Sequence, residues 1–80
     1  SVDGKIYVSS PQPDLLLIAF KTWVGKGFNM EGFLYCSRPL VATDLQIDYY
    51  GNDTVQVGPV PLTLEEKLEA NWHAVSYRLD

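Results

Sequence analysis

Turn-forming prolines and glycines recur at short intervals along the chain. Their spacing limits the length of any helix or strand and is the feature that most constrains the fold. The signals stand at residues 10–13, 25–27, 38–39, 51–53 and 58–61. Short apolar runs between tight turns are typical of small antiparallel β domains, because consecutive strands then need only a hairpin to pair. The sequence therefore predicts a mainly β fold at the borderline of α+β.

The apolar runs predict about six short antiparallel strands. We expect them at residues 5–9, 15–23, 28–37, 44–50, 54–57 and 72–79. In 44–50 the side chains of Leu45, Ile47 and Tyr49 alternate with polar neighbours, which predicts a half-buried strand. Gly32, inside 28–37, predicts a bulge or a bend.

A short helix is predicted over residues 64–70, just before the last strand. Thr63 and Glu66 have the spacing of a capping box, and Leu64 and Leu68 lie one helical turn apart. Five strands, a short helix and a final strand form an order that is similar to small curved sheets or SH3-like barrels, some of which place a helical turn before the last strand. The resemblance is one of layout and implies no function.

The length of the chain predicts one domain. With 80 residues, two separate cores would each be too small to fold without disulfides or metals. A single cysteine cannot form an internal disulfide, which favours a reducing compartment and a cytoplasmic location. The longest apolar run, residues 15–20, is too short for a membrane helix, so we expect no membrane association.

The net charge of −4 disfavours nucleic acid as a partner for this chain. Ten carboxylates face only six Lys and Arg residues, and these cations are scattered singly along the sequence. A phosphate backbone usually requires a clustered basic patch. A small barrel that stacks bases on tyrosines remains an alternative, disfavoured by this acidic balance.

Residues for catalysis are scarce, since the sequence contains one histidine, His73, and one cysteine, Cys36. Cys36 ends the run Phe33-Leu34-Tyr35 in a predicted core strand, where a thiol behaves as a small hydrophobic group. His73 follows a tryptophan at the boundary of an element. We therefore predict no catalytic residues, no cofactor and a protein that is not an enzyme.

A metal site is not expected either. The carboxylates of Asp44, Asp48 and Asp53 surround one predicted hairpin, but they are spread over a strand and its turn. A calcium site requires several oxygen ligands from one compact loop.

Aromatic residues are abundant by contrast, with two Trp, five Tyr and three Phe. A β domain without disulfides has edge strands and apolar surface that a partner can cover. These features favour a non-enzymatic module that binds a protein partner or forms a homo-oligomer. The alternative is a binder of a small hydrophobic or aromatic ligand, or of a peptide, in the concavity of the sheet. Its predicted ligand-binding residues are Trp23, Phe28, Tyr35 and Tyr50.

Overall fold

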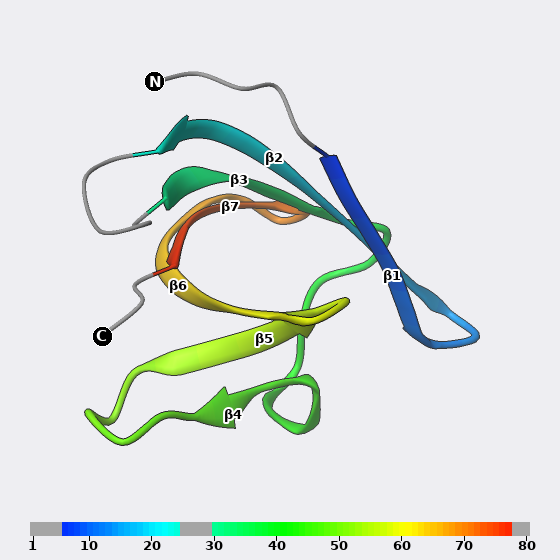
Figure 1. Ribbon diagram of the computed structural model, residues 1–80. Helices are drawn as coiled ribbons and strands as arrows, with labels where there is room; N and C mark the ends of the chain where they lie inside the picture. Colours follow the sequence, from blue (N-terminus) through cyan, green and yellow to red (C-terminus); the bar gives the residue numbers. More distant parts are fainter. Residues whose placement is uncertain (1–5, 25–29, 78–80) are drawn as a thin grey trace.

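The computed structural model describes residues 6–24 and 30–77, which form a single antiparallel sheet with one 3-10 turn (Figure 1). Its elements are β1 (Ile6–Gln12), β2 (Leu15–Val24), β3 (Met30–Cys36), η2 (Ala42–Asp44), β4 (Gln46–Ile47), β5 (Asp53–Val57), β6 (Val60–Glu69) and β7 (Trp72–Tyr77). The strand order is β1-β2-β3-β7-β6-β5-β4. The mainly β, antiparallel prediction is confirmed.

The sheet curls into a half-barrel, as the ribbon in Figure 1 shows. β1 and β2 contact β5 across the interior, although the sheet order places several strands between them. β1 and β4 form the two edges of the sheet. The curvature creates an inner face that holds the core and an outer face on the opposite side.

The core lies on the inner face because side chains alternate along each strand. In β3, buried Met30, Leu34 and Cys36 alternate with Glu31 and Phe33, which are exposed on the outer face. The buried hydrophobic residues are Leu15, Leu17, Ala19, Met30, Leu34, Cys36, Val55, Val57, Leu62 and Val75. One continuous apolar cluster thus fills the curl of the sheet.

The helix predicted over residues 64–70 is wrong, because this segment belongs to the strand β6 and the turn after it. Leu64 pairs with Val75 of β7, and the register shifts twice further along, between Leu64 and Glu66 and between Lys67 and Glu69. These bulges break the period of two that identifies a strand in a sequence. A helix of two turns is also marginal alone, so hairpin pairing with β7 prevails over the capping box.

The strand predicted over residues 44–50 is mostly wrong as well. Ala42–Asp44 forms the 3-10 turn, and only Gln46–Ile47 pairs with β5. Ile47 is 73% exposed and Tyr49 is 88% exposed, so this segment is not half buried. The side chain of Asp48 accepts backbone hydrogen bonds in the following turn, which ends the strand early.

Gly32 marks a bulge, as predicted, but the extra residue lies in the neighbouring strand. In β2 the register shifts between Lys21 and Trp23, which are opposite Gly32 and Glu31. A Cβ atom on Gly32 would lie 2.2 Å from the carbonyl oxygen of Phe20, so the close approach of β2 and β3 requires glycine here.

The remaining predicted strands overlap observed ones. Residues 5–9, 15–23, 54–57 and 72–79 correspond to β1, β2, β5 and β7 in their described parts. Residues 28–37 correspond to β3, with 28 and 29 outside the described residues.

Candidate interaction surfaces

Apolar side chains cover the outer face of the sheet across β1, β2, β3 and β7. They form two rows in which each residue is the register partner of the next. One row is Ile6, Phe20, Phe33 and Ala74, and the other is Val8, Ile18, Tyr35 and Trp72. We call these eight residues the outer apolar face.

Several members of the outer apolar face are strongly exposed. Ile6 is 56%, Val8 61% and Phe33 43% exposed, which is high for side chains of this kind. The ring of Trp72 lies between its aromatic neighbours, with centroid distances of 5.9 Å to Phe20 and 5.3 Å to Tyr35. These ring contacts fix the shape of the surface in advance of any partner.

The outer apolar face is bordered differently on its two sides. On the β6 side, exposed Glu66 pairs with Ala74 and exposed Glu69 pairs with Trp72, so carboxylates end both rows. On the other side β1 is an edge, and its register partners among the described strands lie in β2 alone. The face is thus neutral in its centre and acidic along one border.

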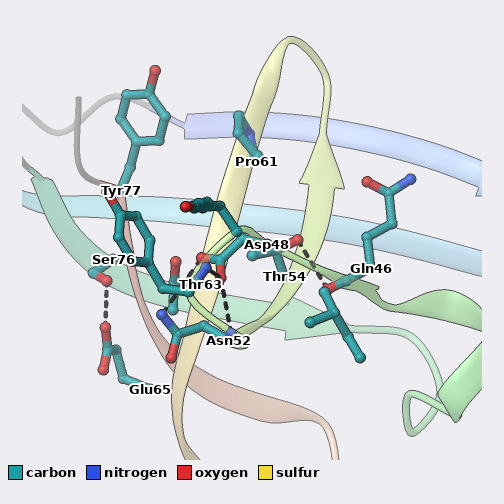
Figure 2. A pocket seen from close by; sticks show the side chains of 12 residues that line it. Gln46, Asp48, Asn52, Thr54, Pro61, Thr63, Glu65, Ser76 and Tyr77 are labelled. Carbon is teal, nitrogen blue, oxygen red and sulfur yellow. Dashed lines mark hydrogen bonds between the residues drawn. The ribbon is translucent and has the colours of Figure 1, made fainter. Parts of the chain in front are cut away.

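A second surface is a groove where the loop after β4 passes β5, β6 and the end of β7 (Figure 2). Its volume is about 680 Å³, within the usual range for ligand pockets. The lining residues are Gln46, Ile47, Asp48, Tyr49, Tyr50, Asn52, Thr54, Pro61, Thr63, Glu65, Ser76 and Tyr77. We call this the tyrosine groove.

The floor of the tyrosine groove is a row of hydroxyl side chains. Thr54 pairs with Thr63, and Thr63 pairs with Ser76, so the three lie on the face opposite the core. The Thr54 hydroxyl donates to the carbonyl oxygen of Gln46 at 3.1 Å, and the Ser76 hydroxyl donates to Glu65 at 2.5 Å. The second of these contacts, drawn in Figure 2, holds a carboxylate beside the floor.

The wall of the groove is a turn organised by Asp48. One carboxylate oxygen of Asp48 accepts the backbone N–H groups of Tyr50 at 2.9 Å and Asn52 at 2.8 Å, while Gly51 adopts a positive φ of 84°. The rings of Tyr49 and Tyr50 lie 5.3 Å apart at an interplanar angle of 64°. A single side chain therefore presents two tyrosines to solvent.

The charge of the groove has one sign. Its ionisable acidic groups are Asp48 and Glu65, and none of the twelve described lining residues is Lys, Arg or His. An anionic ligand would meet repulsion here without compensation, whereas a cation would be attracted.

Two of the predicted ligand-binding residues, Tyr35 and Tyr50, lie on different surfaces. Tyr35 lies on the outer apolar face, and Tyr50 lines the tyrosine groove. In the sheet, β3 is separated from β4, which precedes the turn of Tyr50, by β7, β6 and β5. The backbone of Trp23 lies in β2, but its side chain, like Phe28, falls outside the described residues.

Sequence reasoning missed three aromatic residues of these surfaces. Trp72 contacts Phe20 and Tyr35 on the outer apolar face, and Tyr49 and Tyr77 line the groove. The pairing of β7 with β3 places Trp72 beside Tyr35, and no local pattern indicates that pairing. The run Asp48-Tyr49-Tyr50-Gly51-Asn52 does contain a turn signal, but its first three residues also continue the alternation of the strand predicted over 44–50.

Cys36 and His73 are both buried on the inner face, among core side chains. Burial raises the pKa of the Cys36 thiol to about 11, with a further increase from the charge of Asp44 and a decrease from that of Arg38. Burial also lowers the pKa of His73, whose Nε2 has no hydrogen-bond partner among the described atoms. Both groups are neutral at pH 7, as expected for core side chains.

Asp44 and Asp48, considered as metal ligands, are engaged within the protein. Asp44 accepts two hydrogen bonds from the Arg38 guanidinium, at 2.8 and 3.1 Å, and these chiefly lower its pKa to about 2. Arg38 also donates to Asp14 at 2.9 Å, which ties the β1–β2 hairpin to the segment before β4. In residues 6–24 and 30–77 no group of three or more His, Cys, Asp or Glu side chains is arranged to hold a metal ion.

Comparison with protein-family models, with curated proteins and with solved structures gives no match for this chain. In the part of the chain that the structure describes, we find no helix with the length and hydrophobicity of a membrane-spanning segment. Functional inference therefore rests on the two surfaces.

Proposed function

We propose that the protein is a non-enzymatic interaction module that forms a homo-oligomer through its outer apolar face. The observation that carries the proposal is the two rows of apolar side chains across four strands, with Ile6, Val8 and Phe33 strongly exposed. Monomeric soluble proteins rarely expose contiguous apolar patches larger than a few hundred Å², because covering such a patch gains about 25 cal/mol per Å².

A second copy fits this surface because the eight residues include no charged side chain. Two such faces pack as aligned sheets when a two-fold axis runs parallel to the strands. β1 of each copy then covers β7 of the other. Glu66 and Glu69 of one copy therefore lie on the side of the partner's β1, whose described members of the two rows, Ile6 and Val8, are uncharged. A two-fold axis across the strands would instead bring the acidic borders together, which is unfavourable.

The same proposal includes a cytoplasmic location, which the single buried cysteine supports. It also includes a relationship to SH3-like small barrels, for which the curled antiparallel sheet is the support.

The test is the oligomeric state of the wild type and of two matched variants, measured by light scattering over two orders of magnitude in concentration. We expect the wild type to self-associate and Phe33→Lys, in the centre of the face, to be monomeric. Ile47→Lys is the control, because Ile47 is even more exposed but lies on β4 at the opposite edge. It should associate like the wild type.

Two results would overturn the proposal. One is a wild type that stays monomeric throughout. The other is a Phe33→Lys variant that retains its fold by circular dichroism and still associates, which would assign the contact to edge strands such as β1.

A further inference from the structure

The tyrosine groove combines exposed aromatic rings with carboxylates in one concave surface. Tyr49 is 88% exposed, and its ring lies 5.3 Å from that of Tyr50. Tyr77 of β7 and Glu65 of β6 line the same groove (Figure 2). The groove shares no residue with the outer apolar face, so it requires its own explanation.

The electrostatics of the groove select a cation. Asp48 and Glu65 are acidic, and no lining residue among the described ones carries a positive charge. Asp48 accepts hydrogen bonds from the backbone of its own turn, and Glu65 accepts one from the Ser76 hydroxyl. Aromatic ring faces attract cations within about 6 Å of the centroid.

The shape of the groove distinguishes between ligands of different chemistry. The rings of Tyr49 and Tyr50 meet at 64°, so they do not form the flat platform on which a sugar ring or a base would stack. The more exposed of the two rings, that of Tyr49, can instead contact one planar group of the size of a side chain. A planar guanidinium can stack on one ring and donate parallel hydrogen bonds to a carboxylate, which an ammonium cannot do.

We propose that the tyrosine groove binds an arginine side chain of a basic peptide segment from a partner protein. The guanidinium lies against Tyr49 and donates to Glu65, while the hydroxyl row Thr54, Thr63 and Ser76 forms the floor beneath the peptide. A volume of about 680 Å³ exceeds that of one side chain and leaves room for flanking residues. This binding is independent of self-association through the outer apolar face.

The experiment is a titration of the ¹⁵N-labelled full chain with the peptide acetyl-Gly-Arg-Gly-amide, followed by NMR. The matched probe is the same peptide with citrulline, which has nearly the shape of arginine and no charge. We expect shifts confined to residues 48–52 and 63–65 with the arginine peptide, weaker shifts at high salt, and none with citrulline.

Two variants test the assigned contacts. Glu65→Gln should weaken binding about tenfold, because it removes a charge-assisted hydrogen bond while an amide oxygen can still accept from Ser76. Glu69→Gln is its control, since it removes the same charge from the same strand outside the groove. Tyr49→Ala should weaken binding about threefold, as expected for an exposed cation–π contact.

Three results would overturn the inference. The citrulline peptide binding as tightly as the arginine peptide would remove the role of charge. Equal losses of affinity for the arginine peptide in Glu65→Gln and Glu69→Gln would show that the effect arises from the net charge of the protein and not from a contact with Glu65. Shifts in the groove with a neutral oligosaccharide but not with the arginine peptide would assign the surface to sugars.

Discussion

The two surfaces present aromatic rings by different means. On the outer apolar face, Phe20, Tyr35 and Trp72 project from adjoining strands, and the hydrogen-bond register sets their positions. In the tyrosine groove, Tyr49 and Tyr50 follow a strand of two residues and are held by the side chain of Asp48. The first arrangement depends on the whole sheet, whereas the second depends on one local turn. Substitutions should therefore affect the two surfaces separately.

The largest effect is expected from Gly32→Ala, beneath the outer apolar face. The new Cβ would lie 2.2 Å from the carbonyl oxygen of Phe20, so β2 and β3 must separate locally, at a cost of about 3 kcal/mol in the free energy of unfolding. Gly51→Ala is the matched change in the turn that forms the wall of the groove. The new Cβ would meet open space, and the strain of an alanine at a φ of 84° should lower the free energy of unfolding by only about 1 kcal/mol.

Urea denaturation of both variants measures this difference. Equal losses of stability would show that the close approach of β2 and β3 is not a constraint, and the contrast between the two surfaces would then fail.

A smaller and local effect is expected from Asp48→Ala. Its carboxylate accepts hydrogen bonds from the backbone N–H groups of Tyr50 and Asn52, so the free energy of unfolding of the variant should decrease by about 1–2 kcal/mol. The amides of residues 49–52 should lose protection from hydrogen exchange, while those of β3 and β7 keep theirs. Asp53→Ala is a suitable control, because its exposed side chain follows the same turn. Comparable deprotection in both variants would contradict the role assigned to Asp48.

The smallest effect concerns His73, on the inner side of β7. Burial lowers its pKa below the usual 6.5, so the folded protein binds the proton less readily than the unfolded chain. The free energy of unfolding is at its full value above pH 6.5 and decreases as the pH falls from 6.5 toward the lowered pKa.

The measurement is the urea midpoint at several pH values between 7.5 and 5.5. In the His73→Leu variant the urea midpoint should not depend on pH in this range, since the sequence contains no other histidine. A wild-type midpoint that stays constant or rises on acidification would contradict the account.

The strands that sequence analysis predicted correctly are those with local signals. Val55 and Val57 alternate with polar neighbours in β5, and the turns at 51–53 and 58–61 bracket them. In contrast, the bulges in β6 remove the alternation that a strand usually displays, and Thr63 and Glu66 supply a competing helix signal. For residues 44–50 the alternation was present, but only Gln46–Ile47 finds a partner strand. Alternation predicts which face is apolar and not whether that face is covered.

The composition of the two surfaces could not be predicted, because it depends on strand order. β7 inserts between β3 and β6, so Trp72 meets Tyr35 across a long separation in sequence. The β6–β7 hairpin, formed where a helix is predicted over residues 64–70, brings Ser76 beside Thr63 to form the floor of the groove. Candidate residues chosen for aromaticity alone, such as Tyr35 and Tyr50, are consequently divided between two surfaces.

The most direct test of the central claim is the amide spectrum of the wild type recorded over a wide range of concentration. Self-association through the outer apolar face predicts shifts or broadening at Ile6, Val8, Phe33 and Trp72 as concentration rises, while signals of residues 48–52 stay unchanged. A spectrum that does not vary with concentration, or changes confined to residues 48–52, would contradict the account.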